Sequence, residues 1–122
     1  MTMPDIFLTC PASIPCYRET CARIRAAFPA AALKVDRTQA AFVRGVQFAW
    51  LSAPKRKSDQ GCVILSFSLP ERLASPRIFA SAEPYRGRFM HHMLLHSPDE
   101  LDGACLAWLT EAYAFAERRK EK

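Results

Sequence analysis

The stretch Tyr85–Arg118 constrains the fold more than any other part of the sequence. Its segment Arg88–His96 is typical of a strand, and an amphipathic helix is predicted directly after it. The helix signal begins at Ser97–Glu100, which offers a hydroxyl for an N-cap, a proline at the first helical position and a glutamate three residues after the cap. Because the link is so short, the apolar face of the helix is expected to pack on the sheet that contains the strand.

Apolar residues at helical spacing predict two helices, one near each end of the chain. The first follows Ser13 as its N-cap and is stopped by Pro29, and the second follows the cap at Ser97. The apolar stripes consist of Ile14, Tyr17, Cys21, Ile24 and Phe28 in the first helix, and of Leu101, Cys105, Trp108, Ala112 and Phe115 in the second. Residues 1–12 are expected to be irregular, because prolines discourage regular structure there, and residues 119–122 are expected to form a frayed tail.

Between the two helices the period of the apolar residues changes to two, which predicts strands. The predicted strands cover residues 33–36, 41–44, 46–51, 62–69, 77–82 and 88–96. Gly45 and the polar loop from Pro54 to Gly61 supply turns, so neighbouring strands are expected to run antiparallel. The predicted fold class is therefore α+β, with an antiparallel sheet of about five or six strands and with the N- and C-terminal helices packed on one face. Residues 1–122 are expected to form a single domain.

The composition is that of a globular protein, because 50% of the residues are hydrophobic and 24% are charged. The longest apolar run, Cys62–Leu69, is too short to span a membrane. No secretory signal is recognised at the N-terminus, so a cytoplasmic protein without a membrane partner is expected. The net charge of +5 permits attraction to an anionic partner.

The five cysteines predict neither a disulfide framework nor a zinc site, because their number is odd and no C-x-x-C pair occurs. Cys21 and Cys105 fall on the apolar stripes of the helices. They are therefore interpreted as small buried apolar residues.

The candidate polar pair of the chain is Arg88 and His92, which are four residues apart on one predicted strand. Side chains on a strand alternate between faces, so both project from the same face and can meet an anionic ligand together. The alternative is that this face is simply solvated. His91 projects from the opposite, more apolar face and is expected to be a core histidine bonded to a neighbour.

No metal and no cofactor is predicted. His92 and His96 lie about 13 Å apart along an extended strand, too far to share one ion with bonds of roughly 2 Å. The sequence has neither a G-x-S-x-G nucleophile elbow nor a glycine-rich loop for phosphate. A serine nucleophile of the hydrolase type and a nucleotide-binding loop are therefore not expected.

Four segments carry a resemblance to a known family: Arg37–Phe42, Gly87–His92, Leu101–Asp102 and Trp108–Tyr113. Together they resemble a small bacterial family of domains of unknown function, sometimes found as the tail domain of so-called predicted transport proteins. More distantly, the order of elements is similar to that of the YjbR-like and YdhG-like α+β families. The resemblance implies mainly the fold, with a basic residue at Arg37 and a histidine at His91 or His92. Some YdhG-type relatives are described as frataxin-like iron binders, but this chain lacks the acidic surface for that role.

Three functions remain open at this point. The first is a non-enzymatic binding module for an anionic small molecule, a nucleic acid or an acidic protein segment. Its candidate ligand-binding residues are Arg37, Gln39, Arg88, His91 and His92. The second is an enzyme that uses His91 or His92 as a general base beside Arg88, which requires a concave pocket and a perturbed pKa. The third is a structural domain whose sheet face forms a homodimer.

Overall fold

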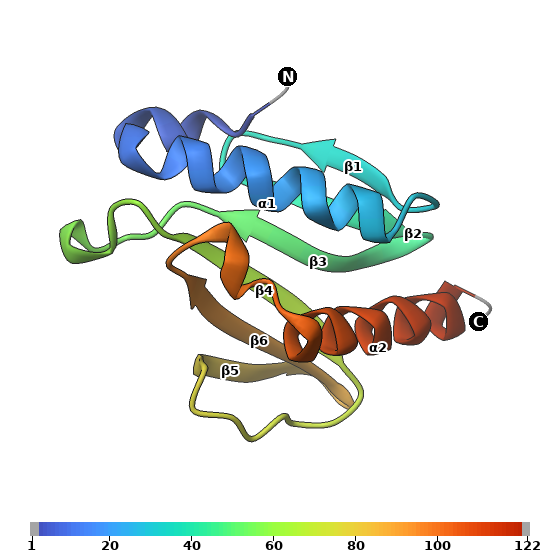
Figure 1. Cartoon of the computed structure of the whole chain (residues 1–122). Coiled ribbons are helices and arrows are strands. Elements are labelled where there is room, and N and C mark those ends of the chain that lie inside the picture. The colour runs from blue at the N-terminus through green and yellow to red at the C-terminus, as the bar shows by residue number, and fades with distance from the viewer. Residues whose placement is uncertain (1–2, 121–122) are drawn as a thin grey trace.

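The computed structural model describes residues 3–120, which form one six-stranded antiparallel sheet with two helices on one face (Figure 1). The helices are α1 (Ile14–Ala27) and α2 (Gly103–Lys120), and the strands are β1 (Ala32–Val35), β2 (Gln39–Arg44), β3 (Val46–Ser52), β4 (Val63–Leu69), β5 (Ile78–Tyr85) and β6 (Arg88–Leu95). The strand order is β1-β2-β3-β4-β6-β5. The predicted fold class is confirmed, with six strands and both helices on one face.

The core lies between the sheet and the two helices, and β4 shows how the sequence defines it. Alternate residues of this central strand, among them Leu65 and Phe67, are fully buried on the helix face. They meet Tyr17 and Ile24 of α1 and Leu109 of α2 in one hydrophobic cluster. The intervening residues of β4 face the other side of the sheet, which the helices leave uncovered.

The N-terminal segment is more ordered than the sequence analysis predicted. Asp5–Thr9 and Pro11–Ser13 form short 3₁₀ helices in place of an irregular chain. Phe7 is fully buried, and its ring centroid lies 4.7 Å from that of Tyr17. Contact with α1 therefore orders a segment in which prolines exclude longer helices. Residues 1 and 2 lie outside the described residues.

The predicted start of the second helix was wrong. Pro98–Glu100 form a 3₁₀ turn, and Leu101 leaves the helical region with φ −77° and ψ 69°. The carboxylate of Asp102 accepts a hydrogen bond of 3.0 Å from the backbone N–H of Cys105. This side chain therefore caps α2, whereas the Ser97 side chain caps no backbone N–H within residues 3–120. At the other end α2 runs to Lys120, which shortens the expected frayed tail, and residues 121–122 lie outside the described residues.

All five cysteines are free and buried. The interpretation of Cys21 and Cys105 as buried apolar residues is confirmed, and burial raises the pKa of the Cys105 thiol to about 11. Within residues 3–120, neither helix combines the length and the apolar character needed to cross a membrane.

Candidate functional site

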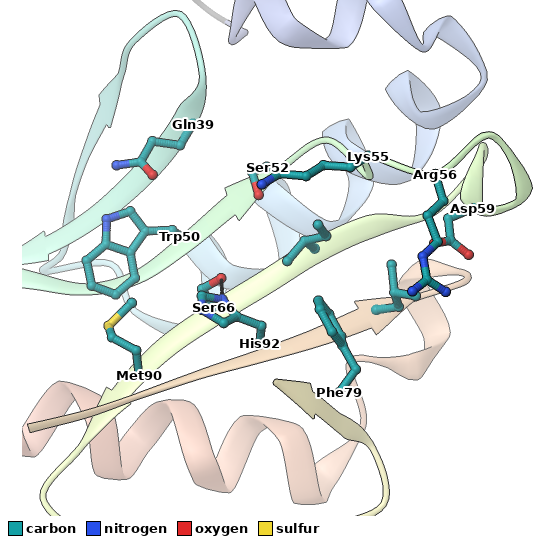
Figure 2. A pocket seen from close by; sticks show the side chains of 12 residues that line it. Gln39, Trp50, Ser52, Lys55, Arg56, Asp59, Ser66, Phe79, Met90 and His92 are labelled. Carbon is teal, nitrogen blue, oxygen red and sulfur yellow. Dashed lines mark hydrogen bonds between the residues drawn. The ribbon is translucent and has the colours of Figure 1, made fainter. Parts of the chain in front are cut away.

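The uncovered face of the sheet holds a pocket with a volume of about 550 Å³ (Figure 2). Its lining comes from five strands and the β3–β4 loop, and consists of Gln39, Trp50, Ser52, Lys55, Arg56, Asp59, Ile64, Ser66, Phe79, Met90, His92 and Leu94. Three cross-strand partners occupy its centre: Trp50 of β3 pairs with Ser66 of β4, which pairs with His92 of β6. Directly paired residues project from the same face, so the register of these strands builds the floor of the pocket.

His92 is the central polar residue of this floor. The hydroxyl of Ser66 lies 2.6 Å from its ring atom Nδ1. Burial lowers the pKa of His92, and the positive charge of Lys55 lowers it further. Because the pKa lies below the usual value of 6.5, the imidazole is neutral at pH 7. The other ring nitrogen, Nε2, has no hydrogen-bond partner within residues 3–120 and is the atom left for a ligand.

Charged side chains border the pocket along the β3–β4 loop. Lys55 and Arg56 contribute positive charge and Asp59 contributes negative charge. Figure 2 shows the Lys55 side chain extending from the loop toward Ser52, with Arg56 and Asp59 at one end of the pocket. Trp50 lies toward the opposite end, beside Met90. The pocket therefore combines a charged rim with a floor in which Ser66 and His92 lie among apolar side chains.

Of the five candidate ligand-binding residues, only Gln39 and His92 line this pocket. Arg37 is exposed in the β1–β2 turn, where its carbonyl oxygen accepts a hydrogen bond from the N–H of Ile6. Arg88, at the start of β6, places its guanidinium 5.4 Å from the ring centroid of Tyr85. Arg88 and His92 are thus separated along β6, and the pocket takes its cations from the β3–β4 loop instead.

His91 lies on the opposite face, in the core, as the alternation along the strand predicts. Its ring is fully buried and lies 5.3 Å from that of Phe67, nearly parallel to it. The backbone N–H of Leu73 donates a hydrogen bond of 2.8 Å to Nε2. The neutral ring therefore carries its proton on Nδ1. Burial lowers the pKa of His91, so the ring stays neutral at pH 7.

Ser66 and Phe79 were not among the predicted site residues, and Lys55 was assigned only to the polar loop from Pro54 to Gly61. Ser66 gives a weak signal, because it and Ser68 are the two polar residues of a largely apolar strand. Its contact with His92 depends on β4 and β6 being neighbours, which the sequence does not reveal. Trp50 was not among the candidate residues either, and it lines the pocket from the outer face.

The fold and the pocket define a small α+β protein with helices on one face of its sheet and a pocket on the other. Residues 3–116 match the family model described as "Domain of unknown function (DUF5655)", and the chain belongs to this family. No curated protein and no solved structure matches the chain. The resemblance to a family of domains of unknown function is thus confirmed, while the likeness to YjbR-like and YdhG-like proteins stays a prediction.

Proposed function

We propose that the pocket around His92 binds a small molecule with an anionic group and an apolar body, and that the protein is a binding module. The observation that supports this proposal is the concave shape of the site. Its volume of about 550 Å³ lies in the range of small-molecule sites, which combine apolar walls with few polar groups. A polyanion such as nucleic acid needs an extended basic surface instead.

The anionic group is proposed to bind between Lys55 and His92. Lys55 and His92 line the same pocket, and the positive charge of Lys55 contributes to the lowered pKa of His92. An anion between them is attracted to the ammonium group and accepts a hydrogen bond from the imidazole. Asp59 repels an anion at the Arg56 end of the rim, which favours the position beside Lys55.

Catalysis by His92 is the second candidate, because its neutral imidazole lies in a concave pocket with a lowered pKa. Nε2 is then the general base. Ser66 is not proposed as a nucleophile, since it lies in a central strand paired on both sides. Its backbone N–H is committed to the sheet and does not form an oxyanion hole.

Removing either Lys55 or His92 is expected to weaken ligand binding. A thermal-shift screen with carboxylates, sugar phosphates, nucleotides and oligonucleotides identifies the ligand class. A ligand at 100 times its dissociation constant adds about 2.7 kcal/mol of stability. Lys55→Ala and His92→Ala are each expected to weaken the best ligand about tenfold or more, because each removes a charge-assisted hydrogen bond.

Lys34→Ala is the matched control, because Lys34 is exposed on β1, outside the pocket lining, and its loss changes the net charge equally. Equal weakening by Lys34→Ala and Lys55→Ala would show that only net charge matters, against the proposed site. A hit with oligonucleotides whose affinity falls steeply with salt would favour a nucleic acid. No hit combined with a concentration-dependent mass would favour the homodimer.

The affinity for a small carboxylate is expected to rise as the pH falls toward the pKa of His92. Burial and Lys55 lower that pKa in the free protein, and a bound anion raises it. The complex therefore binds more protons than the free protein, so lower pH favours binding by up to about tenfold per pH unit. Calorimetric titrations of wild type and His92→Gln test this; an equally steep pH dependence in the variant would contradict it.

A further inference from the structure

A second cavity, with a volume of about 580 Å³, lies beside the pocket. It is lined by Pro76, Arg77, Phe79, Leu94, His96, Glu100 and Asp102. Phe79 and Leu94 line both cavities, so the two spaces are neighbours with a shared boundary.

Leu94 lies at the bottom of the boundary between the two cavities, and the Phe79 side chain stands between them. Leu94 lies within β6, half-buried and directly opposite Ile64 of β4. Phe79 lies on the edge strand β5, where the pairing with β6 shifts between Ile78 and Ala80. Such a bulge places an extra residue opposite the neighbouring strand and redirects its side chain.

The ring of Phe79 consequently projects over the open face beside His92, with 6.2 Å between the ring centroids (Figure 2). It remains 56% exposed although it is a large apolar residue. Folding gains little from an aromatic ring in this position, because most of its surface stays in water. The ring therefore has a more direct use in shaping the cavities than in stabilising the fold.

The second cavity differs from the first in its charges, which are already paired with each other. Arg77 bonds the carboxylate of Asp102 at 3.0 Å, and Nδ1 of His96 lies 3.0 Å from the carboxylate of Glu100. A free anionic group therefore finds no unpaired cation there among the lining residues. This cavity suits the neutral end of a molecule whose anionic end lies beside Lys55.

We propose that Phe79 determines the length of the ligand by separating the two cavities. The inference rests on the proposed function, because it places an anionic group beside Lys55 and His92. The ligand is then an amphiphilic carboxylate whose apolar chain runs over Ile64 and Leu94 and ends against the Phe79 ring. Removing the ring joins the cavities and admits a longer chain.

Straight-chain carboxylates from butanoate to decanoate, titrated by calorimetry, provide the test. In the wild type the affinity is expected to rise about fourfold per methylene group while the chain is being buried, and to stop rising at a limiting length. Phe79→Ala is expected to extend this limit by about three methylene groups, since the deleted ring opens the second cavity. A crystal structure of the variant is expected to show one continuous cavity.

Tyr85→Ala is the matched control, because Tyr85 is an aromatic residue of the same strand, 66% exposed and outside both linings. A longer limit in Phe79→Ala alone supports the inference. An unchanged limit in Phe79→Ala, or the same extension in Tyr85→Ala, overturns the role of Phe79 and leaves the proposed function standing. If the wild type binds no member of the series, the inference of an amphiphilic carboxylate is overturned, and the thermal-shift screen decides whether the proposed function stands.

Discussion

Phe67→Ala is expected to lower the free energy of unfolding by about 3–5 kcal/mol, the cost of deleting a fully buried aromatic ring. Phe67 is 0% exposed in the central strand β4, on the helix face of the sheet. Its ring is stacked with those of His91, at 5.3 Å, and Trp108, at 6.1 Å. The cavity left by alanine removes both contacts. Urea unfolding followed by tryptophan fluorescence measures the loss, which corresponds to a melting temperature lower by about 10–20 °C.

Phe79→Ala is the control for this measurement, because it deletes the same side chain from the same sheet. Phe79 is 56% exposed, so its loss is expected to change the free energy of unfolding by about 1 kcal/mol or less. Comparable losses from Phe67→Ala and Phe79→Ala would contradict the assignment of the two faces of the sheet.

His91→Ala is expected to destabilise the fold by about 3 kcal/mol, because it opens a cavity and deprives a backbone N–H of its acceptor. His91 is 0% exposed and accepts the hydrogen bond from Leu73. His92→Ala, on the open face, is expected to cost much less stability and to weaken ligand binding instead. Unfolding and ligand titration of both variants separate the structural histidine from the ligand-binding histidine.

A histidine whose pKa is lowered by burial also makes stability depend on pH. The stabilisation by neutral His91 is present above the usual histidine pKa of about 6.5 and is lost as the pH falls through its lower value in the folded protein. His91→Gln keeps an acceptor for the Leu73 N–H and does not titrate. This variant is expected to be more stable than His91→Ala. Its stability is expected to depend less on acid pH than that of the wild type.

If His91→Ala abolished ligand binding without loss of stability, the ligand-binding site would instead include His91.

Local patterns sufficed to predict both helices and all six strands. Periodicity reports which residues of an element share a face, and it placed His91 in the core and His92 outside. The start of α2 was misplaced because Ser97 and Asp102 both have capping side chains. Glu100, which would complete a cap at Ser97, instead accepts a hydrogen bond from the N–H of His96, directly after β6.

The candidate site depends on contacts between distant segments, so little of it could be predicted. The strand order places β6 between β4 and β5, which brings Ser66 against His92. A bulge in β5 directs Phe79 onto the same face. Neither the order nor the bulge has a local signature, and without them Arg88 was the nearest cation that the sequence offered to His92.

The most direct test of the His92 pocket is an NMR titration of the ¹⁵N-labelled protein with octanoate, with the amide signals assigned. The signals expected to move are those of the open face and its rim, centred on Ser52, Lys55, Ser66, Phe79 and His92. Signals that move only around Arg37 or on the helix face, or open-face signals that stay fixed at saturating octanoate, would contradict this pocket as the ligand site.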